Sequence, residues 1–197
     1  MATPSSLVDG TKRYLVDWNN IVGGGDDQIT STRLPDEKWT KPIPGYLKLN
    51  TDAAVDPRNR LMGFGWVLRN ENGEFVAAAS IRGKCTFNSK ETEAMAVREA
   101  LTWIKSHGIN FVQAKTDALQ VVQRLDQTVG DSSFDLILFD IKHFLLSVDQ
   151  VAISHVSRTA NTITHRLARE ACSMSVRKEW TTIPPSFIVN ALYFDLN

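Results

Sequence analysis

The hydrophobic pattern of residues 46–81 constrains the fold more than any other feature of the sequence. Polar and apolar side chains alternate with a period of two over residues 46–52, which is typical of a strand. Two more strand-like runs follow, over residues 61–69 and 74–81. Asn72-Gly73, a strong signal for a tight hairpin turn, separates the second run from the third. The segment therefore predicts an antiparallel meander of three strands.

Helices and strands alternate after this meander. Asn88 and Glu91 have the spacing of a capping box and predict a helix that ends near Gly108. Because this crossover helix leads into a strand over residues 111–116, that strand should run parallel to the first one. Further patterns predict helices over 117–129 and 134–146, a strand over 151–156 and a last helix from Asn161. The fold class is α/β, with a mixed five-stranded sheet (three strands antiparallel, two parallel) flanked by helices.

The chain of 197 residues has the length of one domain with tails. Residues 1–43, with a glycine run and several prolines, predict an irregular N-terminal segment, although Trp18 and Trp39 are expected to dock on the domain. The domain itself is predicted over residues 44–178. Residues 179–197, which include Pro184-Pro185, predict a C-terminal tail of low regularity.

Charge and apolar content exclude some classes of protein. Lys plus Arg and Asp plus Glu each number 22, so the net charge is zero, whereas proteins that bind nucleic acid without specificity usually carry a positive excess. Any binding to a phosphate backbone should therefore come from local patches, be weak and depend strongly on salt. No run of 18 apolar residues is present, which predicts no membrane span.

The expected compartment follows from the cysteines and the start of the chain. Cys85 and Cys172 lie far apart without metal-ligand spacing, as expected of reduced thiols. The first twenty residues lack an apolar run of signal-peptide length. We expect an intracellular protein, in the nucleus or the cytoplasm, that acts as a monomer and uses no small-molecule cofactor.

Three acidic residues stand at the ends of predicted elements. Asp52 ends the first strand, Glu93 lies in the first turn of the long helix but on its apolar stripe, and Asp117 joins the fourth strand to its helix. Each has a simpler explanation: Asp117 as a helix N-cap, Glu93 as a glutamate favoured by the helix dipole, and Asp52 as a residue entering a turn.

Topology is what connects the three acids. If the first and fourth strands are neighbours, the three carboxylates converge, and like charges at such proximity need a cation. Oxygen ligands favour Mg²⁺ or Mn²⁺, and two such ions can stabilise the attacking and leaving oxygens of a phosphodiester displacement.

Several stretches of the chain resemble the type 1 ribonuclease H family, and within it the plant branch related to non-LTR retroelement reverse transcriptases. The stretches are 48–54 (KLNTDAA), 63–70 (GFGWVLRN), 93–96 (EAMA), 98–101 (REAL), 116–117 (TD) and 161–168 (NTITHRLA). The flanks at residues 39–44 and 184–185 also resemble that branch, so the resemblance covers residues 39–197. It implies a ribonuclease H-like fold and a catalytic metal site formed by Asp52, Glu93 and Asp117.

The resemblance also identifies a departure from the family pattern. The fourth acid of the family, four residues after an asparagine, is replaced here by His165. Imidazole is a poorer ligand than carboxylate for Mg²⁺ and a better one for Mn²⁺. The resemblance therefore implies His165 as a fourth catalytic and metal-binding residue, with weak activity that prefers Mn²⁺. The basic segment that some members use to bind the hybrid is absent from this sequence.

The expected partner is an RNA–DNA hybrid, whose RNA strand would be cut endonucleolytically. Asn88, Arg158 and Asn161 are candidate contacts to it, because the 2′-hydroxyl that marks RNA is recognised by polar groups. The alternative is a retroelement-derived module that binds nucleic acid but cleaves weakly or not at all, which His165 and the neutral charge favour. A 3′–5′ exonuclease is disfavoured, because those relatives pair the first aspartate with a glutamate two residues later, where this chain has Ala54.

Overall fold

A computed structural model describes residues 38–84, 88–127, 130–148 and 150–196. Within these residues the elements are β1 (Leu47–Asp56), β2 (Leu61–Arg69), β3 (Phe75–Lys84), α2 (Ser89–Ser106), β4 (Val112–Thr116), α3 (Leu119–Leu125), α4 (Ser133–Leu145), β5 (Val151–His155), a 3-10 turn (Thr159–Asn161), α5 (Thr162–Ser173), β6 (Lys178–Trp180) and α6 (Ser186–Asp195). None of the helices in the described ranges is both long and apolar enough to span a membrane.

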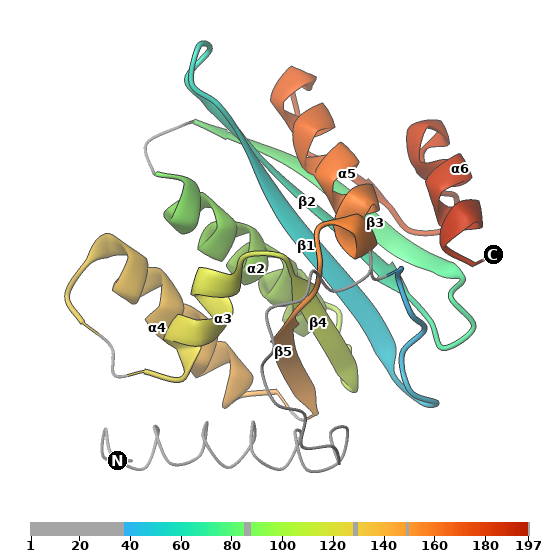
Figure 1. The fold of residues 1–197 in the computed structure, drawn as a ribbon, viewed down its shortest axis with the longest axis horizontal. Coiled ribbons are helices and arrows are strands. Elements are labelled where there is room, and N and C mark those ends of the chain that lie inside the picture. The colour runs from blue at the N-terminus through green and yellow to red at the C-terminus, as the bar shows by residue number, and fades with distance from the viewer. Residues whose placement is uncertain (1–37, 85–87, 128–129, 149, 197) are drawn as a thin grey trace, which may run out of the picture.

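The strands form one mixed sheet in the order β5-β4-β1-β2-β3-β6 (Figure 1). β1, β2 and β3 pair antiparallel as a meander, whereas β4 lies parallel to both β1 and β5. The predicted α/β class and the mixed pairing are confirmed. The predicted number of five strands is wrong, because β6 adds a sixth strand antiparallel to β3. Its three residues are too few for an alternating pattern to reveal it.

The C-terminal segment is more regular than the sequence indicated. Residues 179–197 were expected to have low regularity, but they contain the end of β6 and the ten-residue helix α6. α6 is predominantly apolar, and its Ile188 is fully buried. Its first turn directly follows Pro184-Pro185, so prolines that indicate irregular structure in sequence here precede a helix. The segment completes the fold on the side of α5.

Helices cover both faces of the sheet (Figure 1). Because successive strand residues point to opposite faces, neighbouring positions of β2 pack on different helices. Trp66 faces α2, where its ring lies 4.5 Å from that of Trp103. Val67 faces the other way and packs in a cluster with Leu167 of α5 and Ile188 of α6.

Helix α5 lies unusually close to β2. A Cβ atom on Gly65 would stand 2.4 Å from the backbone nitrogen of Ala168, so only glycine permits this approach. Gly65 is paired with Asp52 across the β1–β2 ladder. The absence of a side chain at this position therefore lets the first turns of α5 approach the strand that carries Asp52.

The N-terminal cap predicted for α2 is present in the structure, whereas the one suggested for α3 is not. The predicted capping box of α2 is present, since the Asn88 side chain accepts from the backbone nitrogen of Glu91 and the Glu91 side chain accepts from that of Asn88. α3, in contrast, begins at Leu119 with no side-chain cap. Asp117 is therefore not the N-cap that its position suggested. This helix is also shorter than the predicted range of 117–129, because α3 ends at Leu125 with Asp126 as its C-cap. Trp18 falls outside the described residues.

Candidate metal centre

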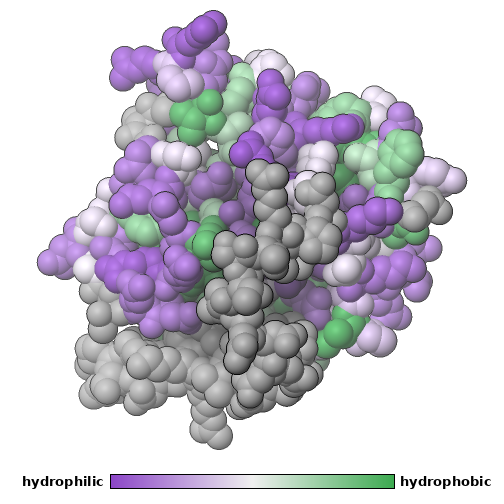
Figure 2. Space-filling view, in the orientation of Figure 1, coloured by the Kyte–Doolittle hydropathy of each residue, from purple (hydrophilic) through white to green (hydrophobic). Residues whose placement is uncertain are grey.

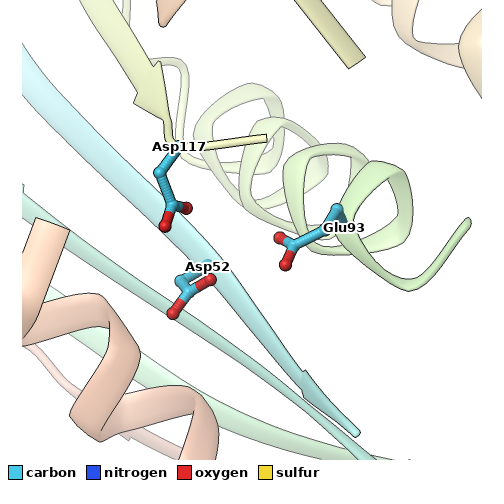
Figure 3. Close-up of side chains that lie close together, drawn as sticks. All are labelled: Asp52, Glu93 and Asp117. Carbon is cyan, nitrogen blue, oxygen red and sulfur yellow. The ribbon is translucent and has the colours of Figure 1, made fainter. Parts of the chain in front are cut away.

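Asp52, Glu93 and Asp117 come together in the folded chain. One ligand oxygen from each lies within 4.8 Å of those of the other two. Figure 3 shows the three carboxylates directed toward a common space, from a strand, a helix and the residue that follows a strand. The predicted convergence of the three acids is therefore present in the structure.

Parallel pairing of β1 with β4 produces this convergence. Thr51 is the ladder partner of Thr116, so the residues that follow them, Asp52 within β1 and Asp117 just after β4, lie at the same level of the sheet. Asp52 does not end its strand, as the sequence suggested, but lies within β1, which continues to Asp56. Glu93 is the fifth residue of α2, just beyond the first turn, and reaches the cluster from the helix that crosses β1.

The electrostatics of the cluster are unfavourable without a cation. Burial, followed by the charges of Asp52 and Asp117, raises the pKa of Glu93 to about 9. Burial and the charge of Asp117 likewise raise the pKa of Asp52 to about 6, although hydrogen bonds from His165 and the Ala53 backbone oppose this shift. Like charges in a shared low-dielectric site explain both shifts. A bound cation would favour the ionised carboxylates and reverse them.

The donor set fits a divalent cation of the Mg²⁺ or Mn²⁺ type. Oε2 of Glu93 is buried and has no hydrogen-bond partner among the described residues, although a buried carboxylate oxygen normally has one. Oxygens bound to one Mg²⁺ at about 2.1 Å are no more than about 4.2 Å apart. The three ligand oxygens here, all within 4.8 Å of one another, would need only a small inward movement to share an ion. Carboxylate oxygens are also the hard ligands that these ions prefer.

His165 contacts the cluster through a single carboxylate. Its Nδ1 lies 2.9 Å from Oδ2 of Asp52, and its side chain is 32% exposed. It is not within the range that unites the three carboxylates. The structure therefore places the predicted fourth ligand beside the site, as a hydrogen-bond partner of Asp52.

The three predicted nucleic-acid contacts have different environments. Arg158 is exposed and lines the pocket at the carboxylates. Asn88 caps α2. Asn161 is 2% exposed, and its Nδ2 donates to Oδ1 of Asp117 at 3.1 Å and to the carbonyl of Thr51 at 2.8 Å. Asn161 therefore positions a carboxylate from inside the protein.

A chain of buried hydrogen bonds continues from Asn161 away from the site. Nδ2 of Asn50 donates to Oδ1 of Asn161 at 3.1 Å, and Nε1 of Trp39 donates to Oδ1 of Asn50 at 3.0 Å. The Trp39 ring is stacked under the guanidinium of Arg69, whose carbon lies 3.5 Å from the ring centroid. Trp39 thus joins the domain, as expected, but its connection to Asp117 was not apparent from the sequence.

Arg69 extends these contacts to the C-terminal helix. Its side chain is 1% exposed and forms a 2.8 Å ion pair with Asp195 at the end of α6. Burial lowers the pKa of Arg69 to about 10, against the opposing effect of Asp195. The C-terminal helix is therefore joined, through Arg69, to the Trp39 ring that begins this chain of hydrogen bonds.

Trp39→Phe should weaken the metal centre without unfolding the domain. Phenylalanine keeps an aromatic ring against the Arg69 guanidinium, but Oδ1 of the buried Asn50 loses the hydrogen bond from Trp39. This loss should lower the free energy of unfolding by about 1–3 kcal/mol. Looser positioning of Asp117 should lower Mn²⁺ affinity by up to roughly tenfold, measured by calorimetry. Trp103→Phe is the matched control, because Nε1 of Trp103 donates instead to Glu179. Equal Mn²⁺ affinities in the two variants would contradict the prediction.

An open pocket of about 540 Å³ gives solvent access to the carboxylates. The small residues Ala53 and Ala54 in its lining leave room for a ligand to approach Asp52. Its lining residues are Asp52, Ala53, Ala54, Val55, Ser89, Glu93, Asp117, Arg158, His165 and Arg169.

Comparison with known proteins agrees with this architecture. A curated Arabidopsis thaliana protein named "Putative ribonuclease H protein" is 30% identical over 140 residues, which cover 70% of this chain and 22% of that protein. The chain thus spans about a fifth of the length of this relative.

Solved structures support the fold. RNase H1 of the archaeon Halobacterium salinarum has a TM-score of 0.59 at 23% identity, covering 66% of this chain and 98% of that one. LC11-RNase H1, isolated from compost and solved in complex with an RNA/DNA hybrid, has a TM-score of 0.57 at 18% identity, covering 64% of this chain and 96% of that one. The chain also matches the family described as "Reverse transcriptase-like" over residues 50–171, which include all three carboxylates and His165. The chain therefore belongs to the reverse transcriptase-like family, with a ribonuclease H-like domain.

Proposed function

We propose that this domain cleaves the RNA strand of an RNA–DNA hybrid endonucleolytically, by metal-dependent hydrolysis of phosphodiester bonds. The observation that carries the proposal is the cluster of Asp52, Glu93 and Asp117, with a buried and unpartnered oxygen on Glu93. A fold without a cation would gain nothing from three converging carboxylates, because each raises the energy of ionising the others. Relatives named as ribonucleases H support the same assignment.

The chain's own residues have distinct roles in this proposal. Asp52, Glu93 and Asp117 would hold two Mg²⁺ or Mn²⁺ ions. When bound, these ions stabilise the charges on the attacking and leaving oxygens of a phosphodiester displacement. His165 orients Asp52 through its 2.9 Å hydrogen bond, and Asn161 orients Asp117. Arg158, exposed at the same pocket, provides a positive charge for a phosphate.

A second candidate function is binding of nucleic acid without efficient cleavage. Two observations favour it: a histidine occupies the position of the family's fourth acid, and the net charge is zero. A domain of this kind would retain the fold and the affinity for hybrid, but turnover would be slow or absent.

One experiment distinguishes the two candidates. The purified chain is incubated with a hybrid labelled separately on each strand, in Mg²⁺, in Mn²⁺ and in chelator. Metal-dependent cutting of the RNA strand alone supports the enzyme. Binding of the hybrid with no cutting in either metal supports the binding module, and cutting of both strands excludes a hybrid-specific ribonuclease.

His165→Asp should increase cleavage in Mg²⁺ relative to Mn²⁺. A carboxylate at this position would add a hard ligand of the kind that Mg²⁺ prefers, whereas the wild-type imidazole hydrogen-bonds to Asp52 and adds no such ligand. The ratio of kcat/KM in the two metals is the quantity to measure, with His143→Asp on the exposed side of α4 as the control. An unchanged ratio in His165→Asp would show that position 165 does not set the metal preference.

A further inference from the structure

Two more pockets continue from the one at the carboxylates. The second, of about 480 Å³, shares Ala54, Val55 and Arg169 with it and follows the turn between β1 and β2. The third, of about 520 Å³, shares Asn59 with the second and reaches the end of β3 and the segment after α5. The three pockets thus adjoin one another through shared lining residues, in a row that leads from the metal centre past the β1–β2 turn to the end of β3.

The second and third pockets carry a strong excess of positive charge. Six basic side chains line them, all exposed, and we call this set the arginine groove: Arg58, Arg60, Arg82, Lys84, Arg169 and Arg177. The one acidic residue among the lining residues, Asp56, already accepts hydrogen bonds from Asn59. In Figure 2 the surface over the β1–β2 tip and the neighbouring end of α5 is mostly hydrophilic. The whole chain has no net charge, so this local excess is a feature of the fold.

The cations of the arginine groove differ in how far they are already engaged: Nη1 of Arg82 donates to the carbonyl oxygen of Met174 at 2.9 Å. Within the described ranges no ion pair engages Arg58, Arg60 or Lys84, whereas Arg177 is paired with Glu179. Arg60 also has a φ of +53°, a left-handed conformation that an arginine adopts at a cost that glycine would avoid. An exposed arginine in a conformation that favours glycine is consistent with a role for its side chain.

We propose that the arginine groove binds the sugar–phosphate backbone of the nucleic acid where it extends beyond the metal centre on the α5 side. The inference rests on the proposed function, because the groove opens into the pocket of the carboxylates. Guanidinium groups bind phosphate through paired hydrogen bonds, and such contacts set position without reading sequence. The groove would thereby supply the local positive patch that a chain of zero net charge needs.

The test compares hybrids of two lengths bound to the full chain carrying Asp52→Asn, so that the substrate is not consumed. The short hybrid covers only the metal pocket, and the long one extends past it on both sides. Arg60→Gln combined with Lys84→Gln removes two groove cations, both in the third pocket. Arg98→Gln combined with Lys105→Gln removes two cations from a separate pocket between α2 and α4 and is the matched control.

The groove variant should bind the long hybrid roughly tenfold more weakly at about 0.1 M salt. The slope of the logarithm of its association constant against the logarithm of the salt concentration should fall in magnitude by about 2. The short hybrid and the control variant should show neither change. Unchanged affinity for the long hybrid would overturn the proposal, as would an equal loss for both lengths, which indicates a general charge effect. Loss of binding to phosphatidylserine vesicles, with hybrid binding intact, would assign the groove to a membrane surface instead. Wild-type cleavage of the hybrid is scored separately, so the proposed function can stand if the groove proposal fails.

Discussion

Asp52→Asn is expected to reduce metal-dependent cleavage of the RNA strand by roughly 10³-fold, which corresponds to about 4 kcal/mol of lost transition-state stabilisation. Asp52 is the most buried of the three carboxylates and lies between Asp117, which directly follows the neighbouring strand β4, and His165 on α5. Asparagine has the same shape and can still accept a hydrogen bond from His165 through its amide oxygen. It carries no negative charge, however, and is a weaker metal ligand.

The same variant should keep its fold. Replacing Asp52 removes one of three like charges from a buried site, so the thermal midpoint in chelator should not fall below that of the wild type. Asp56→Asn is the matched control, because Asp56 lies four residues further along β1 but is hydrogen-bonded to Asn59 at the turn. The measurement is the single-turnover rate with an RNA-labelled hybrid in Mn²⁺. Cleavage by Asp52→Asn at a rate near that of Asp56→Asn would refute the metal centre as the catalytic site.

The sequence predicted the parts of the fold that rest on local patterns. Alternation identified β1, apolar runs on either side of the Asn72-Gly73 turn identified β2 and β3, and the Asn88–Glu91 spacing identified the start of α2. Each of these signals is contained in a few adjacent residues. The convergence of the acids could also be predicted, since parallel pairing of the first and fourth strands fixes Asp52 and Asp117 at one level of the sheet. The resemblance to ribonuclease H supplied the assignment that no local spacing could provide.

Interactions between distant segments could not be predicted in this way. The sequence predicts Asn161 as a contact to nucleic acid, whereas in the structure it is buried among Asn50, Thr51 and Asp117, which lie 44 to 111 residues away in the chain. The hydrogen bond from Trp39 to Asn50 crosses from a segment expected to be irregular. Polar residues at these positions carry no periodic signal, so only the fold identifies their partners.

Glu93→Gln should raise the stability of the metal-free protein at pH 8 and remove most of the stabilisation that Mn²⁺ provides. In the metal-free fold the pKa of Glu93 is raised to about 9, above its ordinary value of 4.5. A folded state that holds its proton more tightly than the unfolded chain loses stability as pH rises between these two values. Wild-type protein in chelator should therefore become less stable from about pH 5 to pH 9. Glutamine does not ionise, so the variant lacks this contribution.

The sign of the difference therefore depends on pH and on metal. Below pH 4.5 residue 93 is neutral in both proteins, and their stabilities should be similar. At pH 8 in chelator the variant should be more stable by about 2 kcal/mol or more, which raises the thermal midpoint by about 4–8 °C. Mn²⁺ at about 100 times its Kd should add about 2.7 kcal/mol to the wild type, and much less to a variant that has lost a ligand.

Glu91→Gln separates this effect from a general effect of removing a glutamate from α2. Glu91 lies two residues away, but its pKa is lowered by hydrogen bonds from Ser133 and the Asn88 backbone, so its ionised form stabilises the fold. Neutralising Glu91 should therefore not raise the stability of the fold. The loss should be small, because glutamine can also complete a capping box. Thermal melts of the three proteins from pH 5 to 9, with chelator and with Mn²⁺, provide the comparison. A thermal midpoint of Glu93→Gln below that of the wild type, in chelator at pH 8, would contradict the prediction. It would mean that the buried oxygen of Glu93 has a stabilising partner other than a metal, and the assignment of this residue as a ligand would be wrong.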